Sequence, residues 1–345
     1  MTEADHFQRA LASDKQSGKS ALVSEYEAAL AACFHAGFAV AVNSGSAAIQ
    51  TALAVLGAAP GRTVIVSAAA PLPTLLPIAA TGASIKFVDC RPDTVGIDPI
   101  ALSNAVDETV VAVVEVPLWG YPLDYAPILE CLAPLGIPLV EDAAQAHGAS
   151  LDGRFVGTLA TVGCFSTHEK KFLSTGEGGF ILTQDGQIAE RCRRYAQLGG
   201  LDGASRGMNF KISAFTAAVG LARLERLDEV VAKRRAARED LLSRIGNWGA
   251  NELAHVGEPN GYNLVIDCKD VFSQDVHPAL ARAGIDTDVE KYGYKCGYRH
   301  RLFAASPAHC PHAEALVGRL VQLPTTGADP AAIAARFVQA MRGGA

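Results

Sequence analysis

Residues 164–179 read CFSTHEKKFLSTGEGG, and this stretch decides the fold. An apolar run typical of a buried strand ends in it, and a glycine-rich turn follows two adjacent lysines. A lysine between a strand and such a turn can form a Schiff base. The carboxylate of Asp142 lies 29 residues before Lys171, which leaves room for one crossover connection. The spacing therefore predicts that both residues return to the same edge of a parallel sheet.

The stretch LVEDAAQAHG, residues 139–148, puts a carboxylate at the mouth of a buried strand, with the amide of Gln145 three residues further on. A buried Asp142 needs a cationic partner. A protonated pyridine nitrogen is such a partner, because a neighbouring carboxylate raises the pKa of the ring nitrogen and keeps it charged, as an electron-sink cofactor requires. The alternative is that Asp142 caps a helix that follows.

Short β-branched runs alternate with Ala- and Leu-rich stretches of helical length between residues 36 and 185. This alternation is typical of parallel strands joined by helical crossovers, and runs of nearly continuous apolar character are typical of strands covered on both faces. The runs lie at residues 38–42, 63–66, 85–88, 110–114, 137–140, 162–165 and 180–183. The pattern predicts an α/β fold with a mostly parallel central sheet.

Beyond residue 212 the pattern changes to a long amphipathic helix followed by mixed elements. The candidates are one helix over 213–244, a strand over 262–267, and helices over 276–283 and 330–342. We therefore expect a large α/β domain over residues 1–235, including an N-terminal helical segment, and a small C-terminal α+β domain over residues 236–345.

Composition narrows the class of protein. The 345 residues are 49% hydrophobic and 19% charged, which excludes global disorder, and a net charge of -6 disfavours nucleic acid and anionic membranes as partners.

No apolar run reaches the roughly 20 residues of a membrane span, and the polar N-terminus is unlike a signal peptide, so we expect a cytoplasmic protein. Eight cysteines without a CxxC pair predict no disulfide framework, and the Cys and His residues of residues 296–312 fit no standard zinc spacing, so we expect no metal site.

The stretch NSGSAA, residues 43–48, follows a predicted strand and opens a predicted helix. Free N–H groups at a helix N-terminus, together with serine hydroxyls, can hold a phosphate. The alternatives are that Ser46 is only the N-cap of the helix and that Gly45 is only a turn glycine.

In order along the chain these motifs resemble the DegT/StrS family of pyridoxal-phosphate-dependent sugar aminotransferases, a branch of the fold type I transferases, over about residues 20–325. EDAAQAHGA at residues 141–149 matches the family pattern letter for letter. The resemblance implies that Asp142 pairs with the pyridine nitrogen, that Gln145 approaches the ring hydroxyl and that Lys171 rather than Lys170 forms the Schiff base. It also implies phosphate contacts from Ser44, Gly45, Ser46, Ala47 and Ser166.

The stretch GMNFK, residues 207–211, resembles a further family element in which an asparagine reaches the cofactor phosphate of the neighbouring subunit. The resemblance therefore implies a homodimer with shared active sites, each completed by Asn209 of the partner. The alternative is that Asn209 caps the helix that follows, although Ser213 is better placed to do so.

Several residues depart from the family pattern. Thr167 replaces a usual Phe, and Pro71 stands where the family stacks an aromatic ring on the cofactor. Trp119 stands where the family often has Tyr, near the active site by analogy or in the core. His168 is expected to line the site, and contact with substrate is left open. Residues 292–295, YGYK, replace a substrate-facing His-Tyr-Pro element.

The resemblance implies transfer of an amino group from an amino acid, glutamate or glutamine, to a keto sugar nucleotide, keto cyclitol or related biosynthetic ketone. One alternative is a lyase or dehydratase that acts on an amino acid or antibiotic precursor. Lys171 argues against the dehydratase, because family dehydratases have His at that position. The other alternative is a non-catalytic regulatory homologue. The presence of both Lys171 and Asp142 argues against it, because a protein without turnover does not need a Schiff-base lysine beside an electron-sink carboxylate.

Overall fold

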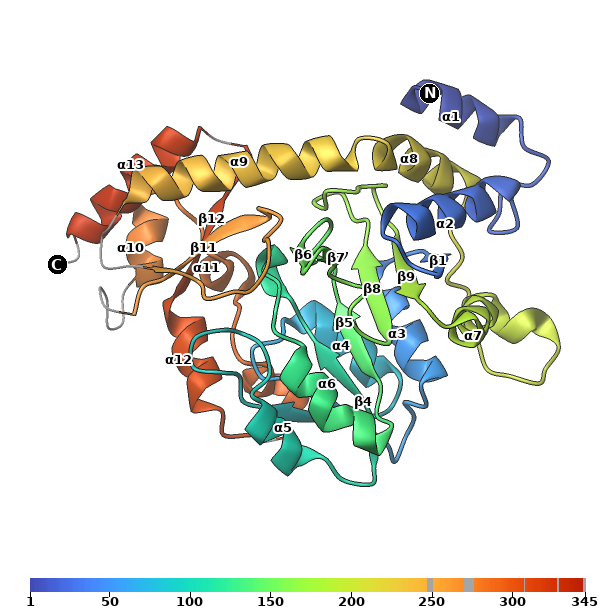
Figure 1. The fold of residues 1–345 in the computed structure, drawn as a ribbon, viewed down its shortest axis with the longest axis horizontal. Helices are drawn as coiled ribbons and strands as arrows, with labels where there is room; N and C mark the ends of the chain where they lie inside the picture. The colour runs from blue at the N-terminus through green and yellow to red at the C-terminus, as the bar shows by residue number, and fades with distance from the viewer. Residues whose placement is uncertain (247–250, 270–275, 307, 328, 344–345) are drawn as a thin grey trace.

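A seven-stranded sheet forms the centre of the chain in a computed structural model that describes residues 1–246, 251–269, 276–306, 308–327 and 329–343 (Figure 1). The strand order is β1-β9-β8-β5-β4-β2-β3. Only β9 of these strands is antiparallel to its neighbours, so the other six share one direction. The predicted α/β fold with a mostly parallel sheet is confirmed. The strands are β1 (Phe38–Val42), β2 (Thr63–Ser67), β3 (Ser84–Val88), β4 (Val110–Glu115), β5 (Leu139–Asp142), β8 (Val162–Ser166) and β9 (Gly179–Thr183).

Helices cover both faces of this sheet (Figure 1). Right-handed crossovers place helices on one face while the chain steps one way along a sheet and on the other face when it steps back. The steps from β1 to β2 to β3 put α3 and α4 on one face, and the return through β4 to β5 puts α5 and α6 on the other. The covering helices are α2 (Ala21–Cys33), α3 (Gly45–Val55), α4 (Leu72–Ala80), α5 (Pro99–Ala105), α6 (Ala126–Leu132) and α7 (Gly186–Ala196).

The strands are apolar along their length because they are buried on both faces. All six residues of β4 are buried, as are all residues of β5, β8 and β9. This burial explains why the sequence shows continuous apolar runs rather than the alternation of a half-exposed strand.

The single helix predicted over residues 213–244 is wrong, because the chain forms two helices there. α8 (Ala214–Leu224) begins at Ser213, whose hydroxyl accepts the Thr216 N–H, and α9 (Leu227–Ile245) follows a break at residues 225–226. α8 packs against α1 (Glu3–Leu11) and α2, whereas α9 packs against α13. Each part buries its apolar stripe on different neighbours, which the continuous periodicity of the sequence does not reveal.

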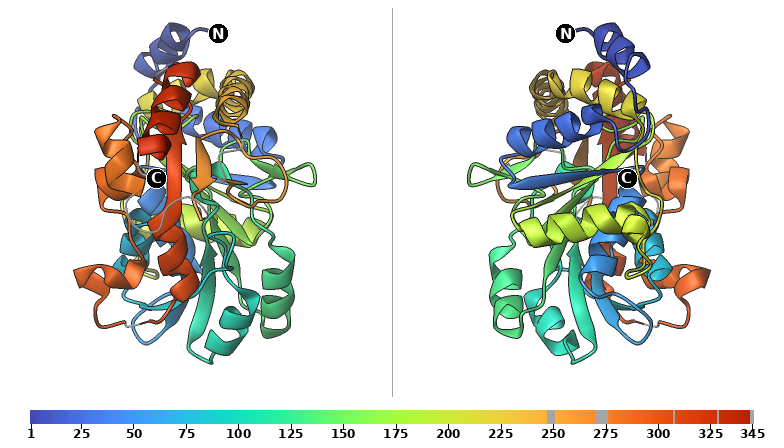
Figure 2. Two further views of the ribbon diagram at one scale, coloured as in Figure 1. Left: turned by 90° about the vertical axis from the view of Figure 1, so that its left-hand side faces the viewer. Right: turned by 90° about the vertical axis from the view of Figure 1, so that its right-hand side faces the viewer.

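A three-stranded antiparallel sheet, in the order β10-β11-β12, packs with the C-terminal helices around a second core. These C-terminal elements face the viewer in the left view of Figure 2 and α7 does so in the right view, so they lie at opposite ends of the molecule. The predicted domain boundary after residue 235 falls inside α9, and the division into two domains stays a prediction. The elements are β10 (Asn251–Glu252), β11 (Asn263–Asp267), β12 (Leu320–Pro324), α10 (Val276–Arg282), α11 (Asp288–Tyr292), α12 (Pro311–Arg319) and α13 (Pro330–Gly343).

A small hairpin, β6 (Ser150–Leu151) with β7 (Arg154–Phe155), completes the regular structure between β5 and β8. In the described part of the chain, no helix combines the length and the apolar character that crossing a membrane requires.

Candidate active site

Asp142 and Lys171 lie at the same edge of the large sheet, as their spacing predicts. Asp142 ends β5, which pairs in parallel with β8, and Lys171 lies in the turn that follows β8 (Figure 1). Burial lowers the pKa of Lys171 to about 8, and the charge of Asp142 opposes that shift. Burial raises the pKa of Asp142, and Lys171 contributes in the opposite direction. The two groups therefore share one electrostatic environment.

The Asp142 carboxylate accepts two hydrogen bonds and has no ion-pair partner among the described residues. Thr74 Oγ1 donates to one oxygen at 2.5 Å, and the Ala144 N–H donates to the other at 3.2 Å. The carboxylate is 6% exposed, and no ion-pair partner lies within 4.0 Å of its oxygens among the described residues. A buried carboxylate in this state fits a protonated ring nitrogen. The capping alternative is wrong, because turns and not a helix follow Asp142.

The predicted phosphate residues surround the N-terminus of α3. The N-cap is Ser44, whose hydroxyl accepts the Ala47 N–H at 3.0 Å, so the alternative that Ser46 is the N-cap is wrong. Gly45 touches the end of β8, since a Cβ on it would lie 2.7 Å from Ser166 Cβ. The first N–H groups of a helix have no partner inside the helix. The cradle between α3 and Ser166 therefore fits a phosphate group.

The two adjacent lysines have different surroundings. Lys171 is half-buried, and its Nζ lies 5.2 Å from the ring centre of Tyr262. Lys170 is exposed and donates to the Tyr292 hydroxyl at 3.5 Å. These surroundings agree with Lys171 as the reactive lysine.

His168 lies on the turn that carries both lysines. Its carbonyl accepts the Lys171 N–H at 2.8 Å, and its Nδ1 accepts the Lys170 N–H at 3.3 Å. Its Nε2 lies 3.8 Å from Glu177 Oε1 at the exposed side of the turn. His168 thus shapes the turn around Lys171, and its contact with substrate stays a prediction.

Gln145 is held by Trp119, for which the sequence left open a place near the active site or in the core. The Trp119 backbone N–H donates to Gln145 Oε1 at 2.6 Å, and Trp119 Nε1 donates to Asp288 Oδ2 at 2.7 Å. Burial raises the pKa of Asp288, whereas Trp119, Lys291 and Lys171 act to lower it. Asp288 thus belongs to the electrostatic surroundings of Lys171, and sequence reasoning missed it because it lies in the C-terminal part of the chain.

Two further C-terminal residues were missed. Asn260 is fully buried, and its Nδ2 donates to the carbonyls of Gln145 at 2.8 Å and His147 at 3.0 Å. Its Oδ1 accepts the Tyr262 N–H at 2.9 Å. Burial raises the pKa of the Tyr262 hydroxyl to about 12, so the ring beside Lys171 stays neutral. No local motif in the sequence points to either residue.

Pro71 and Asn209 occupy different kinds of position. Pro71 precedes α4, and its carbonyl accepts the Thr74 N–H at 3.0 Å. Thr74 is the residue whose hydroxyl donates to Asp142, so Pro71 lies one helical turn before it. Asn209 is exposed, and its side-chain oxygen accepts a hydrogen bond from Lys211. The alternative that Asn209 caps α8 is wrong, because Ser213 is the cap. Among the described residues, Asn209 makes no hydrogen bond or ion pair with the cluster around Asp142 in its own chain.

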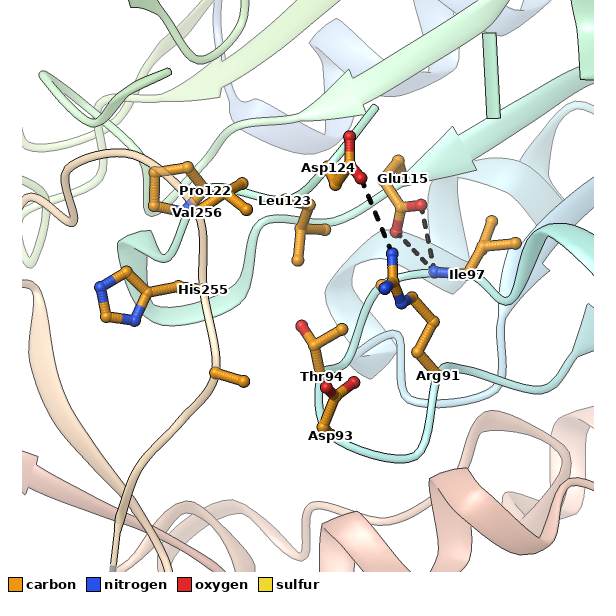
Figure 3. Close-up of a pocket in the computed structure, with 12 residues that line it drawn as sticks. Arg91, Asp93, Thr94, Ile97, Glu115, Pro122, Leu123, Asp124, His255 and Val256 are labelled. Carbon is orange, nitrogen blue, oxygen red and sulfur yellow. Dashed lines mark hydrogen bonds and ion pairs between the residues drawn. The ribbon is translucent and has the colours of Figure 1, made fainter. Parts of the chain in front are cut away.

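A separate cavity of about 140 Å³ lies beside β4 (Figure 3). Glu115 lines it and stands beside Glu141 in parallel register, so it points to the face of the sheet opposite Asp142. The Ile97 N–H donates to Glu115 at 3.2 Å, and Arg91 pairs with Asp124 at 3.8 Å. These groups are paired, whereas the buried Thr94 hydroxyl in the lining has no hydrogen-bond partner in the described part of the chain, and the cavity is not part of the site around Lys171.

The fold and these residues define a class of protein, the fold type I transferases that depend on pyridoxal phosphate. The chain belongs to the DegT/DnrJ/EryC1/StrS aminotransferase family, whose sequence model matches residues 1–341. The predicted family resemblance is thereby confirmed. Membership also confirms pyridoxal phosphate as the predicted cofactor, and the carboxylate and the phosphate cradle fit it.

Relatives of known name include sugar and cyclitol enzymes. The chain is 36% identical over 224 residues, 64% of its length and 59% of the relative's, to dTDP-3-amino-3,4,6-trideoxy-alpha-D-glucose transaminase of Streptomyces venezuelae. It is 32% identical over 264 residues, 72% of its length and 63% of the relative's, to L-glutamine:2-deoxy-scyllo-inosose aminotransferase of Micromonospora echinospora. The chain thus spans less than two thirds of these curated relatives. The crystal structure of S. venezuelae DesV in complex with a ketimine intermediate superposes with a TM-score of 0.86 at 29% identity, covering 99% of this chain and 93% of that chain.

Proposed function

We propose that this protein is an aminotransferase that moves an amino group from glutamate or glutamine to a keto sugar nucleotide, a keto cyclitol or a related biosynthetic ketone. The observation that carries the proposal is the pairing of Lys171, an amine whose pKa burial lowers to about 8, with the buried carboxylate of Asp142 at one sheet edge. The named relatives, a sugar transaminase and a glutamine-dependent cyclitol aminotransferase, support the substrate class.

Pyridoxal phosphate, when bound, supplies an electron sink conjugated to the carbon that gains or loses the amine. Asp142 holds the ring nitrogen in its protonated form, and Thr74 orients the carboxylate. Gln145 would donate to the ring hydroxyl, and Pro71 would pack on the ring. Ser44, Gly45, Ser46, Ala47 and Ser166 hold the phosphate.

Lys171 has two tasks that both require the neutral amine. With the cofactor bound, its Nζ would bond to the aldehyde carbon with loss of water, and once released it would carry a proton from the α-carbon of the donor to the cofactor. An amine with a pKa near 8 carries a neutral fraction at physiological pH that an ordinary lysine lacks. The neutral Tyr262 ring next to it adds no charge that would suppress this fraction.

The same proposal includes a homodimer in which Asn209 of each subunit completes the partner's phosphate site. The exposed Asn209 supports it, because its side chain reaches no part of the cluster in its own described chain. Two-fold symmetry is the commonest arrangement of homo-oligomers and would make both sites equivalent. We also place the protein in the cytoplasm, in keeping with its eight free cysteines.

The lyase or dehydratase and the regulatory homologue are the weaker functions. A regulator that performs no chemistry does not need a lysine of lowered pKa or a buried, unpaired carboxylate. Burial of Lys171 and Asp142 lowers the stability of the fold, so we expect a protein that does not use them to lack them. The one feature that favours a reaction other than transamination is Pro71. It stands where the family stacks an aromatic ring on the cofactor, and proline lacks the quadrupole of such a ring.

The test is a donor screen on the purified protein with bound pyridoxal phosphate. We expect glutamate or glutamine to convert the absorbance band of the bound aldehyde form to that of pyridoxamine phosphate. Lys171→Ala should lose the band and the conversion, whereas Lys170→Ala, the matched neighbour, should keep both. Transamination by Lys171→Ala at the wild-type rate would overturn the proposal, as would a wild-type protein that no amino acid converts.

A further inference from the structure

Trp119 connects Gln145 with the C-terminal part of the chain. Its backbone N–H donates to Gln145 Oε1 at 2.6 Å, and its indole Nε1 donates to Asp288 Oδ2 at 2.7 Å. Trp119 is 1% exposed, so both bonds lie inside the protein. One residue therefore carries two polar contacts that lead to residues far apart in the sequence.

The backbone of Trp119 has an unusual conformation. Its φ of 57° and ψ of 16° lie in the left-handed region, which a bulky residue adopts only when its surroundings hold it there. Gly120 follows with a φ of 81°, and a Cβ on it would lie 1.8 Å from Asn260 Oδ1. This left-handed pair of residues turns the Trp119 N–H toward Gln145.

The indole is the part of Trp119 that the C-terminal elements hold. Asp288 begins α11, and its own N–H donates to Gln322 Oε1 on β12 at 3.1 Å. The ring of Tyr294 meets the indole edge-on at 5.8 Å, and the Tyr294 hydroxyl donates to the Ala69 carbonyl at 2.5 Å. The bond from the indole to a carboxylate is charge-assisted and is the strongest of these contacts.

The hydrogen bond to Trp119 decides which end of the Gln145 amide is free. An amide side chain has an accepting oxygen at one end and a donating NH₂ group at the other. The Trp119 N–H occupies the oxygen, so the NH₂ group points away from Trp119. If the amide turned over, its NH₂ group would face the Trp119 N–H and two donors would meet.

We propose that Asp288 is a positioning residue, which acts through Trp119 to hold the Gln145 NH₂ group toward the ring hydroxyl of the cofactor. The inference rests on the proposed function for the identity of the group that Gln145 faces. Asp288 touches neither cofactor nor substrate in this role. Its carboxylate also lies in the electrostatic surroundings of Lys171, so the experiment must separate an effect of its shape from an effect of its charge.

The first comparison uses the pH titration of the absorbance band of bound pyridoxal phosphate, without any substrate. Asp288→Ala should shift the midpoint so that the protonation constant changes roughly tenfold. Asp288→Asn, whose amide oxygen can still accept from the indole, should stay within about twofold of wild type. An Asp288→Asn protein that matches Asp288→Ala would overturn the inference, because only the charge is lost. Glu290→Gln, an exposed change on the same helix, is the matched control.

The second comparison is a double-mutant cycle. If Asp288 acts only through Gln145, then Asp288→Ala should add no further shift in a Gln145→Ala background. Trp119→Phe, which lacks the indole N–H, should reproduce the shift of Asp288→Ala. Additive shifts from Asp288 and Gln145 would refute the inference while leaving the aminotransferase proposal intact.

A third measurement does not need the cofactor. In a Trp248→Phe background, Trp119 is the one tryptophan of the sequence, and its fluorescence in the cofactor-free protein should change in Asp288→Ala but not in Asp288→Asn. Unchanged fluorescence in Asp288→Ala would contradict the inference. A wild-type protein that binds no pyridoxal phosphate would instead refute the proposed function, and the two failures are therefore distinguishable.

Discussion

The Thr74 hydroxyl donates to Asp142 Oδ2 across 2.5 Å, from a helix 68 residues earlier in the chain. This bond lowers the pKa of a carboxyl that burial raises, so it helps to keep Asp142 ionised. A residue of α4 thereby influences the ionisation of Asp142 at the end of β5.

Thr74→Val should weaken binding of pyridoxal phosphate by about tenfold, since a hydrogen bond to a charged group contributes about 1.5 kcal/mol. Valine nearly preserves the shape of threonine but cannot donate. The measurement is a cofactor titration of the apoprotein. Thr81→Val is the control, because the Thr81 hydroxyl donates only to the Ile78 carbonyl at the end of the same helix. Equal affinity of Thr74→Val and wild type would contradict this role.

Gly45→Ala should disturb the phosphate cradle. The new Cβ would lie 2.7 Å from Ser166 Cβ, and overpacking of this kind destabilises a protein by about 1–3 kcal/mol. We expect a lower melting temperature together with weaker cofactor binding. Gly318→Ala on α12 has open space around it and should leave both unchanged or raise the melting temperature. A Gly45→Ala protein as stable as Gly318→Ala would show that the close approach is absent.

The rate at which the apoprotein captures pyridoxal phosphate should rise with pH and level off above about 8. Burial lowers the pKa of Lys171 to about 8, and only the neutral amine reacts. Stopped-flow absorbance between pH 6 and 10 measures the profile. Lys170→Ala should raise the midpoint only slightly, because the Lys170 charge is the smallest of the four influences on the pKa of Lys171. A midpoint near the ordinary lysine pKa of 10.5 would contradict the desolvation of the half-buried Lys171.

Glu115→Gln should gain stability relative to wild type as the pH rises. Burial raises the folded-state pKa of Glu115 from 4.5 to about 7, so the folded protein binds more protons than the unfolded chain between these values. The contribution of Glu115 is therefore complete below pH 4.5 and is lost through pH 7, a change of about 3 kcal/mol.

Urea unfolding of wild type and Glu115→Gln at pH 5 and pH 8 tests this effect. The difference between the two proteins should favour the variant more at pH 8. Asp93→Asn, an exposed change at the same cavity, should show no such trend. A pH-independent difference for Glu115→Gln would disprove titration of this group near neutrality.

Mixed subunits test the shared site. Asn209→Ala and Lys171→Ala should each be inactive alone, because every site of either homodimer lacks one residue. In a mixed dimer, one site combines the intact Lys171 of one subunit with the intact Asn209 of the other. Random exchange should therefore restore activity to about a quarter of wild type. Absence of recovery after verified exchange would refute completion of the site by the partner.

The sequence predicted those parts of the site that lie in short contiguous motifs at strand ends. Asp142, Lys171 and the residues around Ser44 each follow an apolar run, and the edge of a parallel sheet brings such positions together. Residues supplied by distant elements have no such signal. Thr74, Asn260 and Asp288 resemble ordinary helix and loop residues until the chain folds them against Asp142, Gln145 and Trp119, respectively.

The break between α8 and α9 escaped sequence reasoning for a related reason. Apolar periodicity reports that a helix has a buried stripe, but not which neighbour covers it. α8 is covered by α1 and α2, whereas α9 runs on to α13. The boundary between the two cores falls within α9, since Leu227 and Val231 pack in the core shared with α8, whereas Leu241 and Ile245 pack in the C-terminal core.

Because α9 serves both cores without interruption, it sets the rule for exchanging parts between family members. A chimera joined at residue 235 would splice two half-helices of different origin, each of which would keep the core of its own parent. A join at residues 225–226 would transplant α9 whole, together with the sheet and α13 that it packs against, but Leu227 and Val231 would then meet a foreign core. Either join therefore requires α9 to fit two parents, which makes this helix the element that limits recombination.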